Sequence, residues 1–139
     1  MLLTFGGSRH KPLTPINAYA DRTLACPVCT TTELAFFGDR YACAQCTGTF
    51  VQNAAFEAMA MDIANHFFEL PPATGEPGPR ACPVCSTPML VETLDAVPID
   101  RCGAHGIWFD GNELTVALER ASGQFQHGWR AWLRRVFHS

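Results

Sequence analysis

Eight soft metal ligands occur in four close pairs, and their spacing constrains the fold more strongly than any other feature of the chain. Two residues separate the members of each pair, so both side chains can turn back onto one point. Seven cysteines would leave one thiol over in a disulfide framework, whereas adding one histidine gives two sets of four. The spacing therefore predicts two structural zinc sites. The first consists of Cys26, Cys29, Cys43 and Cys46, and the second of Cys82, Cys85, Cys102 and His105.

Both predicted sites take all four ligands from the protein, which leaves no coordination position for water or substrate. The sequence shows no nucleophile–base pair and no paired carboxylates, so we expect neither an enzyme nor a small-molecule substrate. Free thiols or redox-active pairs are the alternative for the cysteines, although a thioredoxin-like motif needs a neighbouring βαβ pattern that is not seen here. For His105 the alternative is a surface side chain beside an incomplete site.

The first predicted ribbon unit covers residues 26–70. Strands are expected at 33–37 and 40–42 on either side of a Gly-Asp turn. A helix is expected over 52–69, with Asn53 as its N-cap and Pro71-Pro72 as its end. Its apolar stripe consists of Phe56, Met59, Ile63 and Phe67.

The second unit, residues 81–121, repeats this organisation. Strands are expected at 90–94 and 97–101, followed by a helix that begins with a capping box of Asp110 and Glu113. The units therefore form a tandem internal repeat. Besides their ligands, they match at Phe50/Phe109 and Asn53/Asn112.

The remaining segments have weaker signals. Residues 1–25 are interpreted as an N-terminal arm that packs through Leu24, and the Pro-rich residues 71–80 as an irregular linker. Residues 122–139 are interpreted as a basic-aromatic amphipathic helix. The predicted fold class is a small zinc-stabilised α+β protein, with two tandem zinc ribbons (a β-hairpin plus helix each) and this C-terminal helix.

The stretch from Cys82 to Leu114 resembles the bacterial transcription factor IIB-type zinc-ribbon family. The resemblance rests on Cys-Pro-Val-Cys, on the run Gly-Ile-Trp-Phe-Asp after the last ligand, and on Glu-Leu at the helix start. It implies a zinc-ribbon fold and, by analogy of fold only, a link to transcription. His105 stands where the family usually has cysteine, which makes the site more sensitive to acid, and Ser86 stands where glycine is common. The first unit resembles a degenerate copy of the second unit.

We expect a non-enzymatic zinc-binding adaptor in a reducing cytoplasm, because no signal peptide or run of about 18 apolar residues is visible. The formal charge of −3 favours a protein partner over nucleic acid. A thiol redox or zinc-release switch at Cys26/Cys29 or Cys43/Cys46 is an alternative, as is a peripheral membrane module anchored by residues 124–138. The candidate partner-binding residues are Trp108, Trp129, Arg130, Trp132, Arg134 and Arg135.

Overall fold

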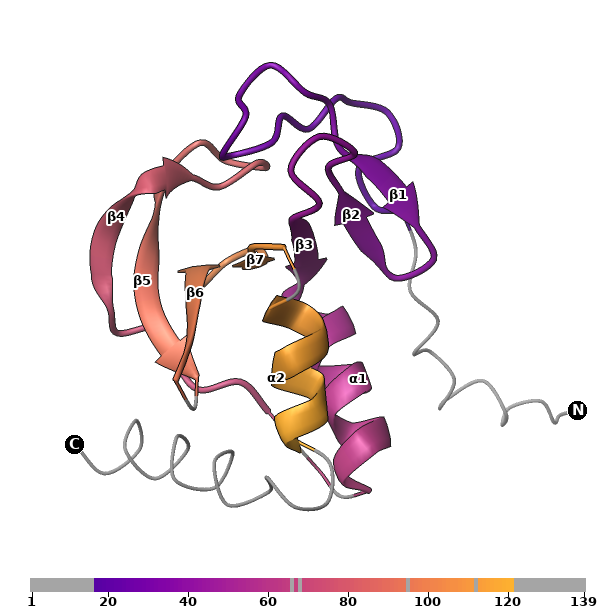
Figure 1. Cartoon of the computed structure of the whole chain (residues 1–139), viewed down its shortest axis with the longest axis vertical. Helices are drawn as coiled ribbons and strands as arrows, with labels where there is room; N and C mark the ends of the chain where they lie inside the picture. The colour runs from indigo at the N-terminus through magenta and orange to yellow at the C-terminus, as the bar shows by residue number, and fades with distance from the viewer. Residues whose placement is uncertain (1–16, 66, 68, 95, 112, 122–139) are drawn as a thin grey trace, which may run out of the picture.

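A seven-stranded antiparallel sheet runs through both units and carries two short helices (Figure 1). The structure is a computed structural model that describes residues 17–121 except 66, 68, 95 and 112. The strand order is β1-β2-β3-β7-β6-β5-β4. The elements are β1 (Ala35–Phe37), β2 (Arg40–Ala42), β3 (Thr49–Gln52), α1 (Asn53–Ala64), β4 (Glu76–Ala81), β5 (Pro88–Leu94), β6 (Val97–Cys102), β7 (Gly106–Phe109) and α2 (Glu113–Ala121).

Both predicted hairpins are present, and the second agrees with its predicted strands to within two residues. Helix α1 is shorter than predicted. It ends at Ala64 because Asn65 adopts a left-handed conformation (φ 61°) and donates its N–H to the Met61 carbonyl at 2.8 Å. Phe67, predicted on the apolar stripe, therefore lies beyond the helix and is 75% exposed.

The two units meet at the centre of the sheet, where β3 pairs with β7. The sequence prediction did not include these strands. They occupy equivalent positions in the repeat, and their antiparallel pairing aligns Thr49 with Phe109 and Phe50 with Trp108. Shifting each residue by the repeat length of 59, the separation of Phe50 and Phe109, converts the first pair into the second. The units are therefore related by a local two-fold axis between these pairs.

The prediction of an irregular linker at residues 71–80 was wrong for its second half. Residues 76–81 form β4, which pairs with β5 at the edge of the sheet. An edge strand tolerates Pro77 and Pro79 because one of its sides needs no ladder hydrogen bonds. Arg80 fixes the strand through ion pairs to Asp100 on β6 and to Asp110.

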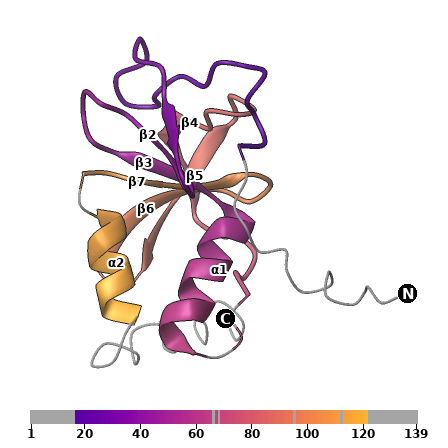
Figure 2. The same ribbon diagram turned by 90° about the vertical axis from the view of Figure 1, so that its right-hand side faces the viewer.

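Apolar side chains pack on both faces of the sheet. Both helices lie on one side of it (Figure 2). On that side Phe56 of α1 stacks on Phe109 of the other unit, with ring centroids 5.7 Å apart. The opposite face packs Phe50 and Trp108 together with Leu24, which is buried as predicted. Each face thus contains a core drawn from both units.

Candidate metal centres

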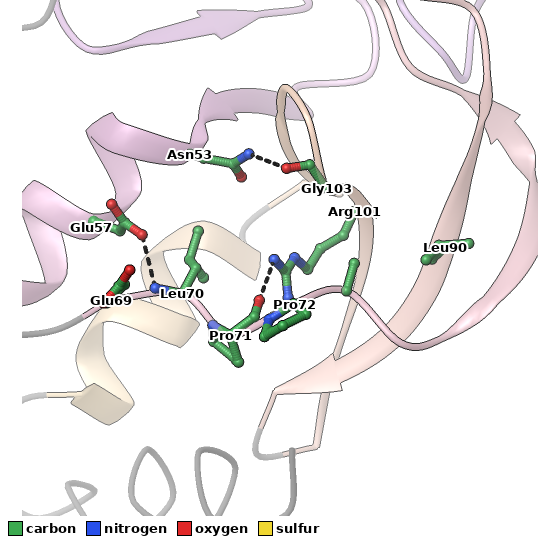
Figure 3. A pocket seen from close by; sticks show the side chains of 10 residues that line it. Asn53, Glu57, Glu69, Leu70, Pro71, Pro72, Leu90, Arg101 and Gly103 are labelled. Carbon is green, nitrogen blue, oxygen red and sulfur yellow. Dashed lines mark hydrogen bonds between the residues drawn. The ribbon is translucent and has the colours of Figure 1, made fainter. Parts of the chain in front are cut away.

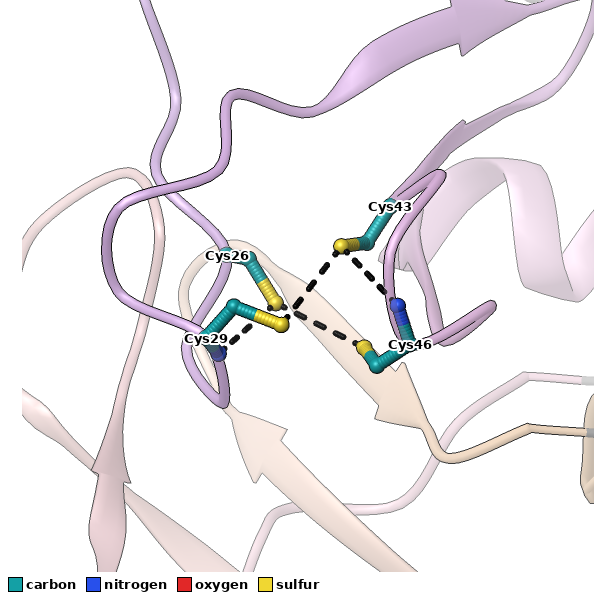
Figure 4. Close-up of side chains that lie close together, drawn as sticks. All are labelled: Cys26, Cys29, Cys43 and Cys46. Atoms are coloured by element: carbon teal, nitrogen blue, oxygen red, sulfur yellow. Dashed lines mark hydrogen bonds between the residues drawn. The ribbon is translucent and has the colours of Figure 1, made fainter.

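The first predicted site, hereafter the first cluster, gathers its four cysteines between two knuckles, as Figure 4 shows. The Cys26 and Cys46 sulfurs are 3.7 Å apart, and the Cys29 and Cys43 sulfurs are 3.9 Å apart. Zn–S bonds of about 2.3 Å in a tetrahedron place neighbouring sulfurs about 3.8 Å apart. Backbone N–H groups point at the sulfurs, with Cys29 N 3.3 Å from Cys26 Sγ and Cys46 N 3.4 Å from Cys43 Sγ. Such contacts stabilise bound thiolates.

The second predicted site, hereafter the second cluster, is assembled in the same way from three cysteines and one histidine. The Cys85 and Cys102 sulfurs are 3.8 Å apart. His105 presents Nδ1 at 3.5 Å from Cys102 Sγ and 3.9 Å from Cys82 Sγ. His105 thus takes the place that Cys46 has in the first unit, as its sequence position predicts.

The pKa values of the thiols differ within each cluster. Burial raises the pKa of Cys46 and of Cys82 to about 12. Burial acts in the same direction at Cys43, but backbone N–H groups of its own turn outweigh it and lower the pKa to about 7. The hydroxyl and N–H of Thr87 lower the pKa of Cys85 to about 6. Each cluster therefore contains a readily ionised thiol and one that keeps its proton until a metal displaces it.

The donor atoms of each cluster lie within 4.8 Å of one another, and all seven cysteines are free thiols. These distances and the soft donor set fit tetrahedral zinc. The chain thus has two clusters arranged for metal binding, one of four cysteines and one of three cysteines with a histidine. Both are consistent with structural zinc ions.

The residues that follow His105 join the second unit to the first through strand pairing and through packing in both cores. A Cβ at Gly106 would lie 2.5 Å from the Val51 carbonyl oxygen, so glycine permits the close β3–β7 pairing. Ile107 and Phe109 enter the core beneath the helices. Trp108 enters the opposite core with an exposed fraction of 0%, so it does not belong to a partner surface, and this expectation was wrong.

Asp110 joins this motif to the edge strand, a contact that sequence reasoning missed. Its carboxylate accepts hydrogen bonds from the Trp108 indole at 3.0 Å and from the Arg80 guanidinium at 2.6 and 2.8 Å. The Glu113 carboxylate accepts a hydrogen bond from the Asp110 N–H at 3.1 Å. This is the contact that a capping box predicts for its glutamate. An arginine inside a Pro-rich segment gives no sequence signal for this role.

Residues 81–120 match the transcription factor zinc-finger family. Zinc ribbons of this family are typically structural and not catalytic. The match covers the second unit and leaves the first unit outside it. Comparison with curated proteins and with solved structures gives no match.

An open pocket of about 700 Å³ lies beside the second cluster, between the start of α1 and β6 (Figure 3). Arg101 lines it, but this buried guanidinium donates to the Pro71 carbonyl at 2.8 Å and to Glu92 at 3.3 Å. Gly103 and Asn53 face each other across its rim. None of the eight predicted metal ligands lines this pocket.

The C-terminal members of the predicted partner surface lie outside the described residues. So does the segment 124–138 of the membrane alternative, and Asn112 of the repeat. None of the described helices is long and apolar enough to cross a membrane. The unplaced members of the predicted surface are Trp129, Arg130, Trp132, Arg134 and Arg135.

Proposed function

We propose that the protein is a non-enzymatic adaptor whose two zinc clusters hold one sheet in shape for a protein partner. The observation that supports this proposal most strongly is that both clusters take all four ligands from the protein and are joined to the core by buried cysteines. Cys26, Cys43 and Cys82 are at most 2% exposed and pack in one apolar cluster with Trp108. A metal site with four protein ligands supplies folding energy and offers no open position for chemistry.

The charge of the described part favours a protein over nucleic acid. All 13 acidic residues lie between Asp21 and Glu119, whereas the same segment of the sequence contains only four arginines. Arg40, Arg80 and Arg101 form ion pairs with acidic side chains, and Arg22 donates to a carbonyl. Phosphate contacts supply most of the affinity of nucleic-acid-binding proteins, and these arginines are already engaged. We therefore favour a partner that presents basic or apolar groups.

Two surfaces are proposed for the contact. One is Phe37 at the tip of the β1–β2 hairpin, which is 62% exposed. The other is the basic-aromatic segment at residues 129–135, which contrasts in charge with the rest of the chain and would contact acidic groups elsewhere on the same partner. An aromatic side chain held outward on a zinc-supported hairpin offers apolar contact area to a protein.

Photo-crosslinking with the zinc-loaded full chain tests this function. A crosslinker at position 37 should capture a protein that survives nuclease treatment, and chelation of zinc should abolish capture. The same crosslinker at exposed Glu33 is the matched control. Salt-sensitive binding to duplex or single-stranded nucleic acid without protein capture would contradict the proposal.

A thiol switch is a second candidate, and one observation moves it to the second cluster. Cys85 is the exposed thiol among the seven cysteines, and the Cys102 sulfur lies 3.8 Å away. Hydrogen peroxide would oxidise these two thiolates to a disulfide and be reduced to water, with release of zinc. Zinc release and a Cys85–Cys102 disulfide after mild peroxide would support this function, and protected thiols with retained zinc would exclude it.

A further inference from the structure

Both knuckles of the second cluster receive hydrogen bonds from the first unit and the residues just before it. The Arg22 guanidinium donates to the Val84 carbonyl at 2.8 Å, within the first knuckle of the cluster. The Asn53 backbone N–H donates to the His105 carbonyl at 3.1 Å, and its side-chain Nδ2 donates to the Gly103 carbonyl at 3.0 Å. The two side-chain contacts join residues 62 and 50 positions apart along the chain.

The contacts reach the loops that carry the ligands. Val84 lies between Cys82 and Cys85, and Gly103 lies between Cys102 and His105. A hydrogen bond to a carbonyl in such a short loop fixes the direction of the neighbouring donor atoms. Groups that orient metal ligands in this way commonly change metal affinity by about 10–100-fold when removed.

The Cys102–His105 turn is held differently from its counterpart in the first unit. In the Cys43–Cys46 turn, Cys43 donates to the Gly48 carbonyl at 3.0 Å and Thr47 donates to the Cys43 carbonyl at 2.9 Å. The second turn is closed by a bond from His105 N to the Cys102 carbonyl at 3.1 Å and by the strand pairing of Cys102 with Gly106. The two bonds from Asn53 then fix the carbonyls of Gly103 and His105 from outside the turn.

Asn53 can do this because it begins α1. The first N–H groups of a helix have no partner within the helix, so the Asn53 N–H is available for the His105 carbonyl. Asn53 was predicted to be the N-cap of its own helix, but Gln52 holds that position, and the Asn53 side chain extends across the pocket rim to Gly103 (Figure 3).

We infer that Asn53 and Arg22 are positioning residues for the second metal cluster. Residues 81–120 contain all four ligands and the whole family match, yet both of the loops that hold the metal are oriented from outside this segment. Zinc affinity at the second cluster therefore depends on the first half of the chain. This inference rests on zinc binding at the second cluster and not on the proposed partner, so either can fail without the other.

The test measures the zinc affinity of each cluster in the full chain. Asn53→Asp keeps the shape of the side chain but removes the Nδ2 donor, and Asn53→Ala removes the contact altogether. We expect zinc affinity at the second cluster to fall about 10-fold or more. While the second cluster is loaded, the affinity of the first cluster should stay within about twofold of the unmodified chain. Chelator competition gives the affinities, and cobalt substitution distinguishes the two clusters, because a histidine ligand changes the visible spectrum.

Asn17→Ala is the matched control. Asn17 accepts a hydrogen bond from the Tyr41 hydroxyl at 2.6 Å, well away from the knuckles of the second cluster in the sequence. It should leave the cobalt spectrum of the second cluster unchanged, whereas the Asn53 variants should shift it. Equal shifts in the cobalt spectra of both clusters, or no change in either, would overturn the inference.

Arg22→Ala decides the question if the Asn53 variants do not fold. Arg22 lies at the surface, so its removal takes away the bond to Val84 with little loss of packing. Arg40→Ala is its control, because Arg40 pairs with neighbouring Asp39. Selective loss of affinity at the second cluster in Arg22→Ala supports the inference, and affinities equal to those of Arg40→Ala overturn it.

Discussion

The two units contain similar metal clusters, but different structures lie at the two outer edges of the sheet. In the second unit β4 runs beside β5, and Arg80 locks it to Asp100 and Asp110. In the first unit the chain before the first knuckle meets the hairpin through the Ala25–Glu33 bridge and the Leu34 to Leu24 hydrogen bond. The second unit thus encloses its own sheet edge with a full strand.

The metal-binding loops of the second unit, in contrast, are held by residues of the first unit and by Arg22 just before it. The second cluster takes hydrogen bonds from Arg22 and Asn53, and the Phe109 ring stacks on Phe56 of the first unit's helix. A tandem repeat whose equivalent central strands pair with each other becomes one structure, in which neither unit is complete alone. The following predictions test this comparison from the largest expected effect to the smallest.

Removing one ligand should unfold both units. Cys43→Ser in the first cluster and Cys102→Ser in the second each abolish one zinc site, whose binding energy is on the order of 10 kcal/mol. This is comparable to the whole stability of a small domain, about 5–15 kcal/mol. Zinc content and the dispersion of amide NMR signals measure the outcome. A Cys43→Ser chain that keeps a folded, zinc-loaded second unit would show that the units are independent.

Gly48→Ala should destabilise the joint between the units. A Cβ at Gly48 would overlap the ring of Trp108, which is fully buried and cannot move aside freely. We expect a loss of about 2–3 kcal/mol in urea unfolding of the zinc-loaded chain. Gly103→Ala is the control, since its Cβ would meet only the Ala73 methyl at 3.7 Å. Equal stability of the two variants would mean that the Gly48–Trp108 contact is not tight.

Zinc affinity should rise with pH at both clusters. Cys46 and Cys82, each with a pKa of about 12, keep their protons in the metal-free chain at neutral pH, and zinc must displace them. One displaced proton corresponds to about tenfold in affinity per pH unit, or about 1.4 kcal/mol.

The pH at which zinc affinity begins to change more steeply should differ between the two clusters. Cys43, with a pKa of about 7, adds a further proton below pH 7, and Cys85, with a pKa of about 6, adds a further one below pH 6. Chelator competition between about pH 5.5 and 8.5 measures both slopes. Affinity that is constant with pH, or that falls as pH rises, would contradict the proton displacement.

Glycine substitutions in the knuckles should give the smallest effects. Thr30 and Ser86 occupy equivalent positions after the second cysteine, and both have positive φ angles, 63° and 65°. Replacing either by glycine should relieve backbone strain and stabilise the protein by about 0.5–1 kcal/mol. Thr30→Gly should gain more strain relief because threonine is β-branched. Thr31→Gly, whose φ is not positive, should be destabilising, as judged by urea midpoints.

The ligands and hairpins could be predicted from the sequence because their signals are local. Two residues between Cys82 and Cys85 fix a knuckle, and Gly38-Asp39 marks a turn, whatever the rest of the chain does. The strand β4 could not be predicted, because its prolines are acceptable only at a sheet edge and the edge is known only from the fold.

The joining of the units also required the structure. Phe50 and Phe109 were identified as equivalent, but equivalence in a repeat does not say that the two strands pair with each other. Asn53 gave a cap signal of the usual kind, and the partner of its side chain lies 50 residues away in the chain. These contacts depend on how the two units are placed relative to each other. The spacing of the ligands describes each unit separately and says nothing of that placement.

Native mass spectrometry during a zinc titration of the full chain tests most directly whether the two clusters form one structure. We expect two zinc ions per chain at saturation and, at half saturation, mainly metal-free and doubly loaded chains, since coupling between sites is reciprocal. A dominant singly loaded chain at half saturation would show independent sites. Saturation at one zinc ion per chain would contradict the two-cluster assignment itself.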